Sequence, residues 1–315
     1  MNDLFNNLAF VFPGQGSQSV GMLSELGAGR AEIKHTFEEA SSVAGIDLWR
    51  LSQEGPDDQL NLTINTQPIM LAAGVAVWRV WCNETDVRPS WLAGHSLGEY
   101  TALVCSNAVS FQDAVKLVIE RARLMQEAVK PGAGAMAAIL GMDAPDVVNL
   151  CLEISGEQVV APVNFNAPGQ IVVAGHTEAV DRMIAIAKEH GAKRAVLLPV
   201  SVPSHCVLME QAAEKLEIFI REITIKTPKI SIVHNFDVAS HASPEVVISV
   251  LKKQLCHPVR WVESVKFLHE QGVEFLVECG PGKVLTGLNK RIARSCTTAS
   301  IFDGKTLDQT LGLIA

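Results

Sequence analysis

A serine in a glycine-flanked turn is the first feature of this sequence that could do chemistry. Gly94, Ser96 and Gly98 form a G-x-S-x-G motif, and the flanking residues predict a short strand over 90–93 and a helix over about 97–105. A serine forced into a tight turn between a strand and a helix exposes its hydroxyl above the sheet, where backbone N–H groups can hold an oxyanion. The motif alone is weak evidence, because an ordinary strand-to-helix turn with an N-capping serine also fits it.

A nucleophilic serine needs a base, and the chain has nine histidines. His205 stands out because it ends the loop Ser201–His205, just after the last strand expected in the middle of the chain. A residue placed where two domains meet lies over a cleft. By position alone, a loop histidine without a task remains the more ordinary interpretation. His95, next to Ser96, is expected to point away from it and to be structural.

Arg121 lies in an apolar stripe of the helix predicted over 111–129. Its neighbours three and four residues away are Leu117, Val118, Leu124 and Met125. Arg123 on the same helix instead has charged neighbours, which indicates a solvated face. A buried guanidinium needs an anionic partner, because an unpaired buried charge is costly. That partner is either an internal Asp or Glu or a substrate carboxylate, which arginine binds with two parallel hydrogen bonds.

The glycine-rich segment Phe12–Gln18 fails both tests of a nucleotide-binding loop. Ser19 stands where the dinucleotide fingerprint needs a glycine, and Met22 stands where a P-loop needs a lysine. A loop that offers backbone N–H groups to an oxyanion fits this segment better.

Strands and helices alternate along both ends of the chain, and they would position these residues. The strands are expected at 8–12, 90–93, 230–234 and 274–278, with helices between them that include 67–81, 244–255 and 262–271. Ser110 is the expected N-cap of the helix that carries Arg121. This alternation predicts an α/β fold with a mostly parallel sheet.

The middle of the chain has a different order. After a break at 131–134 the pattern predicts strands and helices in the order βαββαβ, which is the ferredoxin-like arrangement. A length of 315 residues suits about two domains, or one large domain with an insert. We therefore expect a discontinuous α/β domain, residues 1–130 and 201–315, interrupted by a ferredoxin-like insert over 131–200.

Composition narrows the class of protein. The net charge of −8 argues against nucleic acid as the main partner. Seven cysteines, with no C-x-x-C pair, favour a reducing compartment and no metal site. No apolar run approaches the roughly 20 residues of a membrane-spanning helix, and the N-terminus has no signal-peptide pattern. We expect a cytoplasmic protein without membrane attachment that acts as a monomer.

Taken together, the motifs resemble the malonyl-CoA:acyl carrier protein transacylases of type II fatty acid synthesis. The likeness covers essentially the whole chain in order. It is carried by the segments 12–18, 94–100 (GHSLGEY), 121–129, 134–141, 164–170 (NFNAPGQ), 201–205 (SVPSH), 254–261 and 278–282 (ECGPG). The resemblance implies an α/β-hydrolase-like domain with a parallel sheet, interrupted by the small ferredoxin-like subdomain.

The resemblance also implies the catalytic roles. Ser96 would be the nucleophile and His205 its base, oriented by the backbone carbonyl of Gln254 in place of a carboxylate. Gln15 and Leu97 would donate their backbone N–H groups to the oxyanion. The implied reaction is ping-pong transfer of a malonyl group, through a malonyl-serine, from malonyl-CoA to the phosphopantetheine thiol of acyl carrier protein.

The substrate contacts follow from the same resemblance. Arg121 would bind the free carboxylate of the malonyl group, and Asn166 would support the site from behind. No metal or cofactor is expected on the enzyme, because the thioester is already activated and phosphopantetheine belongs to the carrier.

Carrier proteins are acidic, so this acidic chain should carry a local basic patch beside its cleft. The candidates are Lys193 and Arg194, close in sequence to His205, together with Lys290 and Arg291. Solvated charges without a partner explain these positions equally well.

Three other functions remain open at this point. A serine hydrolase or thioesterase would use the same serine and histidine, with water as the acceptor. A carrier-binding protein without activity would keep the fold alone. An acyltransferase for polyketide assembly would differ in the carrier that it serves.

Overall fold

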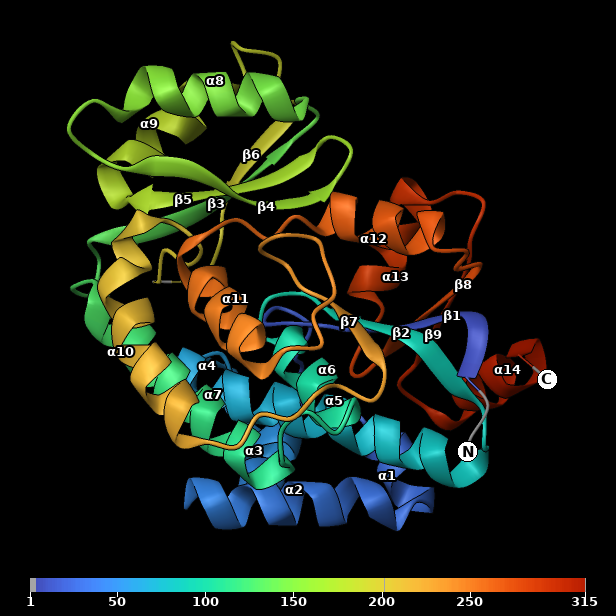
Figure 1. Cartoon of the computed structure of the whole chain (residues 1–315). Coiled ribbons are helices and arrows are strands. Elements are labelled where there is room, and N and C mark those ends of the chain that lie inside the picture. Colours follow the sequence, from blue (N-terminus) through green and yellow to red (C-terminus); the bar gives the residue numbers. More distant parts are fainter. Residues whose placement is uncertain (1–3, 201, 315) are drawn as a thin grey trace.

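A computed structural model describes residues 4–200 and 202–314 of the chain, so Ser201 of the loop before His205 lies outside the described residues. Two sheets organise the structure (Figure 1). Sheet A has the order β7-β2-β1-β8-β9, and sheet B has the order β4-β5-β3-β6. The strands of sheet A are β1 (Leu4–Phe12), β2 (Arg88–Gly94), β7 (Ser231–Val233), β8 (Phe275–Cys279) and β9 (Thr297–Ile301). All of its strand pairs are parallel, which confirms the α/β expectation.

Helices surround sheet A along most of the chain. They are α1 (Ser24–Gly29), α2 (Ala31–Ala44), α3 (Leu48–Glu54), α4 (Asp57–Leu60), α5 (Thr63–Glu84), α6 (Gly98–Cys105), α7 (Phe111–Ala128), α10 (Glu210–Glu222), α11 (Pro244–Cys256), α12 (Trp261–Glu270), α13 (Val284–Ile292) and α14 (Gly304–Ile314), with a short 3₁₀ turn at Val207–Met209. In Figure 1, α2, α5 and α7 lie below sheet A, and α12 and α13 lie above it. No helix in the described ranges combines the length and apolar character needed to span a membrane.

Burial on both faces explains the continuous apolar run of β1. Leu8, Phe10 and Phe12 point into a core that they share with α5 and α7. Ala9 and Val11 point the other way, into a second core formed with α12 and α13. A strand of a parallel sheet that helices cover on both sides has this pattern.

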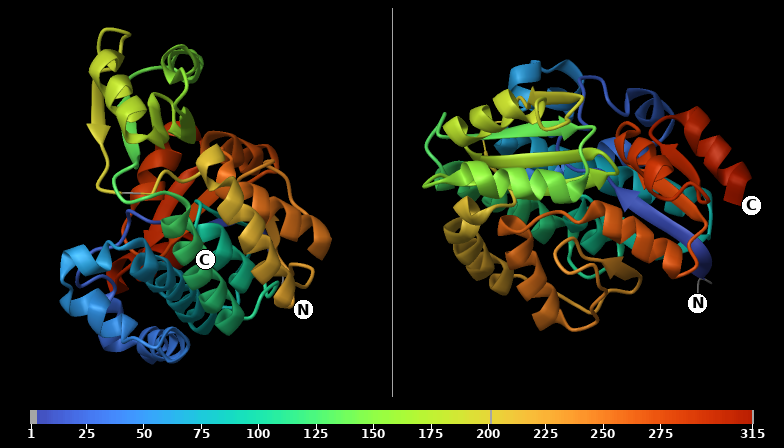
Figure 2. Two further views of the ribbon diagram at one scale, coloured as in Figure 1. Left: turned by 90° about the vertical axis from the view of Figure 1, so that its left-hand side faces the viewer. Right: turned by 90° about the horizontal axis from the view of Figure 1, so that it is seen from above.

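Sheet B forms the insert that projects from the larger part of the molecule (Figure 2). Its strands are β3 (Gly134–Leu140), β4 (Val160–Ala167), β5 (Gln170–His176) and β6 (Arg194–Leu197), all paired antiparallel. The helices α8 (Ala144–Ser155) and α9 (Thr177–Ala187) cover one face of this sheet. The element order and strand order are those of a ferredoxin-like fold, as the sequence predicted.

Several elements differ from the sequence prediction. The sequence pattern predicts the last strand of the insert over 194–200 and its second helix over 177–190, whereas β6 ends at Leu197 and α9 ends at Ala187. The edge strand β9 and the helices α10 and α14 were not predicted. β9 is half-exposed along most of its length and lacks a buried apolar run, so its residues give little strand signal.

Ser110 caps the helix α7, as predicted, because its hydroxyl accepts the Asp113 N–H at 3.1 Å. Two glycines permit a closer contact where α6 begins. A Cβ on Gly98 would lie 2.1 Å from the carbonyl oxygen of Phe12, and one on Gly94 would lie 1.9 Å from the carbonyl carbon of Gly98. Both distances are too short for any side chain, so β1, β2 and α6 meet through backbone alone.

We expect Gly98→Ala to lower the free energy of unfolding by about 3 kcal/mol, because the backbone of β1 must move to admit a methyl group. Gly287→Ala in α13 is the matched control, since no heavy atom lies within 4 Å of its Cβ position. That change should stabilise the protein by up to about 1 kcal/mol. Urea unfolding followed by circular dichroism measures both, and equal midpoints for the two variants would contradict the close contact.

Candidate active site

The loops that follow β1 and β2 converge on a cavity at the carboxyl ends of these strands. The cavity encloses about 110 Å³. Its floor comes from the large domain and contains Gln15, Thr63, His95, Ser96, Leu97, Arg121, Met125 and His205. Its roof comes from sheet B and the segment after it, with Met136, Asn164, Leu198, Val200 and Val202. Ligand sites of parallel sheets commonly lie at this end of the strands.

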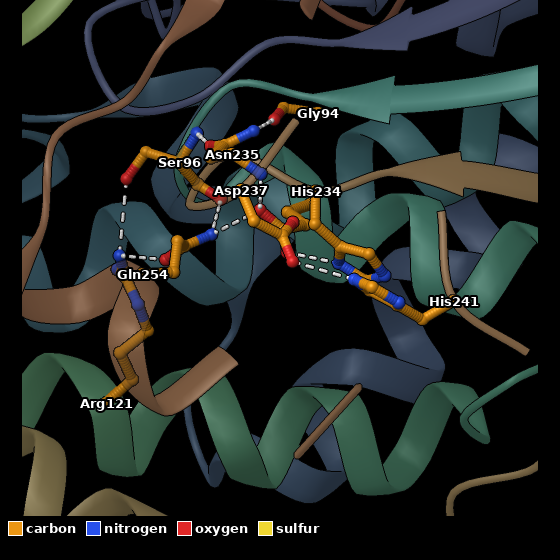
Figure 3. Close-up of polar contacts among 9 residues, drawn as sticks. Gly94, Ser96, Arg121, His234, Asn235, Asp237, His241 and Gln254 are labelled. Atoms are coloured by element: carbon orange, nitrogen blue, oxygen red, sulfur yellow. Dashed lines mark hydrogen bonds and ion pairs between the residues drawn. The ribbon is translucent and has the colours of Figure 1, made fainter. Parts of the chain in front are cut away.

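Ser96 occupies the strained turn that its motif predicts. Its backbone φ is +52°, which non-glycine residues rarely adopt. The amide of Asn235 holds the turn in place, as Figure 3 shows. Asn235 Oδ1 accepts the Ser96 N–H at 2.7 Å, and its Nδ2 donates to the Gly94 carbonyl at 2.7 Å. One side chain therefore bridges the last residue of β2 and the residue at the tip of the turn.

His205 contacts Ser96 directly. Its Nε2 lies 2.7 Å from Ser96 Oγ, and its Nδ1 lies 2.8 Å from the backbone carbonyl of Gln254. A carbonyl oxygen can only accept, so Nδ1 carries the proton and Nε2 is free to accept the serine hydroxyl. This arrangement has the geometry of a nucleophile and base whose third member is a carbonyl rather than a carboxylate.

The surroundings keep His205 neutral. The imidazole is 3% exposed. Burial, and next the positive charge of Arg121, lower the pKa of His205 to about 3. Both effects disfavour the imidazolium form. At neutral pH the ring is therefore in the form that can take a proton from Ser96.

Arg121 is buried on α7, at 1% exposure, with its guanidinium beside Ser96. It donates to Gln67 Oε1 at 2.9 Å, to Ser96 Oγ at 3.2 Å and to Gln254 Oε1 at 3.3 Å. The ring of Tyr100 lies 5.4 Å away. Its polar contacts within the described residues are all to neutral oxygens. The internal carboxylate considered as a partner from the sequence is therefore not in contact with Arg121.

Leu97 and Gln15 both line the cavity. Their backbone N–H groups make no hydrogen bond within residues 4–200 and 202–314. A Cβ on Gly14 would lie 2.4 Å from the His95 carbonyl, so the loop that contains Gln15 packs directly against the turn of Ser96. Two unengaged donors beside the serine can hold an oxyanion.

Asn166 lies one layer behind the serine, where its Oδ1 is 2.7 Å from His95 Nε2. This contact gives His95 a structural partner, and the His95 ring also packs against Trp261 at 5.5 Å. The partners of the His95 ring are thus Asn166 and Trp261 rather than Ser96, as expected for a structural residue, and His95 also lines the cavity. The tight approach of Gly14 to the His95 backbone places this residue at the floor.

The four basic candidates lie away from the cavity and are exposed. Arg194 pairs with Leu140 of β3, which in turn pairs with Gln170 of β5. The Arg291 guanidinium contacts the Gln170 side chain. The two pairs, Lys193 with Arg194 and Lys290 with Arg291, thus border the same end of sheet B. Leu198, which lines the cavity, follows Arg194 by four residues, about 13 Å along an extended chain.

Three buried polar residues of this site were not predicted from the sequence: Gln67, Glu99 and Asn235. Glu99 and Asn235 are fully buried, and Gln67 is 1% exposed. Gln67 lies within an apolar helix, where a lone amide is a signal that could have been used. Among the residues that the structure describes, no group of three or more His, Cys, Asp or Glu is arranged to hold a metal ion.

Comparison with known proteins gives consistent matches over the whole chain. The acyl transferase domain family matches residues 9–304. The malonyl CoA-acyl carrier protein transacylase of Salmonella typhimurium is 52% identical over 303 residues, which cover 96% of this chain and 98% of that protein.

Two solved structures are also similar. A malonyl-CoA:acyl carrier protein transacylase from Xanthomonas oryzae has a TM-score of 0.97 at 48% identity, covering 99% of each chain. A malonyl-transacylase in complex with a type II PKS acyl-carrier protein has a TM-score of 0.95 at 50% identity, covering 97% of this chain and 99% of that one.

We expect labelling of Ser96 by the neutral reagent diisopropyl fluorophosphate to keep its rate from pH 8 down to about pH 5. The base loses its function only when His205 is protonated, and the pKa of His205 is about 3. Arg121→Met removes a charge that lowers this pKa, so the acid limb of the rate should move to higher pH. Arg123→Met, on the solvated side of the same helix, is the control and should leave the profile unchanged. A wild-type rate that halves near pH 6.5 would contradict this account.

Proposed function

The chain belongs to the malonyl-CoA:acyl carrier protein transacylase family of acyl transferases, as its motifs indicated, and on that premise we propose that it moves a malonyl group from malonyl-CoA to the phosphopantetheine thiol of an acyl carrier protein. The observation that carries this proposal is the contact of Ser96 with both His205 and a buried arginine that has no carboxylate partner among the residues that the structure describes. Such a site offers a nucleophile to a thioester and a cation to an acid group on the same molecule.

In the first half-reaction, His205 Nε2 takes the Ser96 proton as Oγ attacks the thioester carbonyl carbon. The negative charge that develops on the carbonyl oxygen is stabilised by the N–H groups of Gln15 and Leu97. When this intermediate collapses, the carbon–sulfur bond breaks and His205 returns the proton to the sulfur of CoA. The product is a malonyl ester on Ser96.

In the second half-reaction, the carrier thiol takes the place of CoA. His205 accepts the thiol proton, sulfur attacks the ester, and the carbon–oxygen bond to Ser96 breaks. The proton then returns to Ser96 Oγ. The same base and the same oxyanion donors thus serve both half-reactions, as ping-pong transfer requires.

Arg121 accounts for the choice of acyl group. The malonyl carboxylate would accept hydrogen bonds from the guanidinium N–H groups that now donate to neutral oxygens. Hydrogen bonds between charged groups are stronger than those to neutral oxygens. Acetyl-CoA offers no such group, so the buried charge would stay without a partner. A site built around a polar group rejects the analogue that lacks it.

We propose that the product, the malonylated carrier protein, supplies fatty acid elongation in the cytoplasm. A role in polyketide assembly has one specific observation in its favour, because a relative at 50% identity is known in complex with a type II polyketide carrier. The two roles use the same enzyme chemistry and differ only in the carrier. Hydrolysis to free malonate is the third outcome, and it requires water rather than a thiol to reach the ester.

Brief exposure to malonyl-CoA should add one malonyl group to the wild-type protein and none to Ser96→Ala. The ester forms only on the hydroxyl that His205 activates. Intact-protein mass spectrometry detects the adduct.

Addition of phosphopantetheinylated acyl carrier protein should then clear the adduct, with the malonyl group appearing on the carrier. Rapid loss of the adduct in buffer alone would identify a hydrolase. An equal adduct on Ser96→Ala, or none on the wild type, would remove Ser96 as the nucleophile.

Charge reversal at the end of sheet B should weaken use of the carrier. Lys193→Glu with Arg194→Glu, or Lys290→Glu with Arg291→Glu, should raise KM for the carrier about threefold to tenfold and reduce its salt dependence. KM for malonyl-CoA should not change. Lys34→Glu on α2, which lies on the far side of sheet A (Figure 1), is the control. Unchanged carrier kinetics would remove these residues from the interface.

A further inference from the structure

Arg121 faces a second buried charge that it does not touch. The amide of Gln254 separates them, because its Oε1 accepts from the Arg121 guanidinium at 3.3 Å and its Nε2 donates to Glu99 Oε2 at 2.9 Å. The same Nε2 also donates to the Ser96 carbonyl at 2.9 Å. Figure 3 shows this amide between Arg121 and the polar cluster beneath Ser96.

Glu99 is fully buried and surrounded by N–H groups. Besides the Gln254 amide, its carboxylate meets the backbone N–H of Asn235 at 3.1 Å and Nδ1 of His234 at 2.7 Å. The Gln254 amide and the Asn235 N–H can only donate, and with its proton on Nδ1 the His234 ring donates as well, so an ionised carboxylate, which only accepts, satisfies all three contacts. Glu99 therefore contributes a negative charge to the interior.

His234 does not cancel this charge. Its Nε2 is buried and has no hydrogen-bond partner in the described part of the chain. An imidazolium would leave a charged N–H unpaired there, whereas the neutral ring leaves only a lone pair, and unpaired buried groups cost more when they carry charge. Among the described residues, the other buried charge near Glu99 is that of Arg121, across the Gln254 amide.

We propose that Glu99 is the fixed countercharge of Arg121 and sets how strongly the cavity holds a carboxylate, an inference that rests on the proposed function. A carboxylate in direct contact would occupy the guanidinium and compete with the substrate. Held one amide away, Glu99 balances the charge of Arg121 while the N–H groups of the guanidinium stay available. Glu99 is thus a positioning residue that acts on specificity through Gln254 and Arg121.

Two substitutions should change carboxylate binding in opposite directions. Glu99→Gln removes the countercharge and keeps the shape, so Arg121 should attract a substrate carboxylate more strongly. Gln67→Glu places a carboxylate on the Arg121 N–H that is now 2.9 Å from the Gln67 amide oxygen. That direct pair should weaken the attraction.

The experiment measures the dissociation constants of malonyl-CoA and acetyl-CoA by titration calorimetry, in a Ser96→Ala background that prevents acylation. The ratio of the two constants reports carboxylate recognition alone. Glu99→Gln should raise the preference for malonyl-CoA about tenfold, and Gln67→Glu should lower it by a similar factor, as expected for charges a few ångströms apart in a partly buried site. Glu120→Gln, a partly buried carboxylate on α7 paired with Arg123 away from the cavity, should leave the ratio unchanged.

Loss of binding in equal proportion for both ligands would overturn the inference, because a residue that only supports the fold cannot distinguish them. Should Glu99→Gln fail to fold, Glu99→Asp carries the test. Glu99→Asp keeps the negative charge but places it farther from the Gln254 amide, so the preference for malonyl-CoA should rise about twofold. An unchanged preference overturns the inference. A parent protein that binds acetyl-CoA as tightly as malonyl-CoA would instead refute the proposed function.

Discussion

Where β1, β2 and α6 converge, backbone packs against backbone, and the site is arranged around that contact. Gly94 and Gly98 leave no room for a side chain, and Gly14 brings the loop after β1 onto the His95 carbonyl. The N–H groups of Gln15 and Leu97 are fixed beside one serine as a result. Loops of ordinary side-chain thickness would hold the backbones of Gln15 and Leu97 farther apart. The positive φ of Ser96 is the local strain that accompanies this packing.

The buried charges are placed so that each affects the site without being used up in an ion pair. Arg121 contacts neutral oxygens, and its field helps to hold the pKa of His205 at about 3. On the proposed function, the group that recruits an acid substrate therefore also keeps the base unprotonated. A carboxylate bound at Arg121 would weaken that field, so the basicity of His205 would rise when substrate is present. In the proposed mechanism, one guanidinium thus couples recognition of the substrate to proton transfer.

Periodicity and spacing were enough to predict part of this site. Arg121 was singled out because its helical neighbours are apolar, and the turn of Ser96 follows from two glycines at fixed offsets. The contact of Glu99 with Asn235 could not be predicted, because these residues lie 136 positions apart and meet only after β2 and β7 pair in sheet A. Likewise, orientation of His205 by a backbone carbonyl leaves no trace in residue type. The strands differ in the same way. The sequence predicted β1, which helices cover on both faces, but not β9, which is half-exposed and has no buried apolar run.

The cavity has a floor and a roof that belong to different sheets. Ser96, His205 and Arg121 come from the large domain, whereas Met136 and Asn164 come from the insert. Residues that set the space available to an acyl chain can therefore vary while the reacting groups keep their positions. On the proposed function, Met136 and Asn164 are the positions at which protein engineering would change the acyl group that the cavity admits, while Ser96, His205 and Arg121 keep their places.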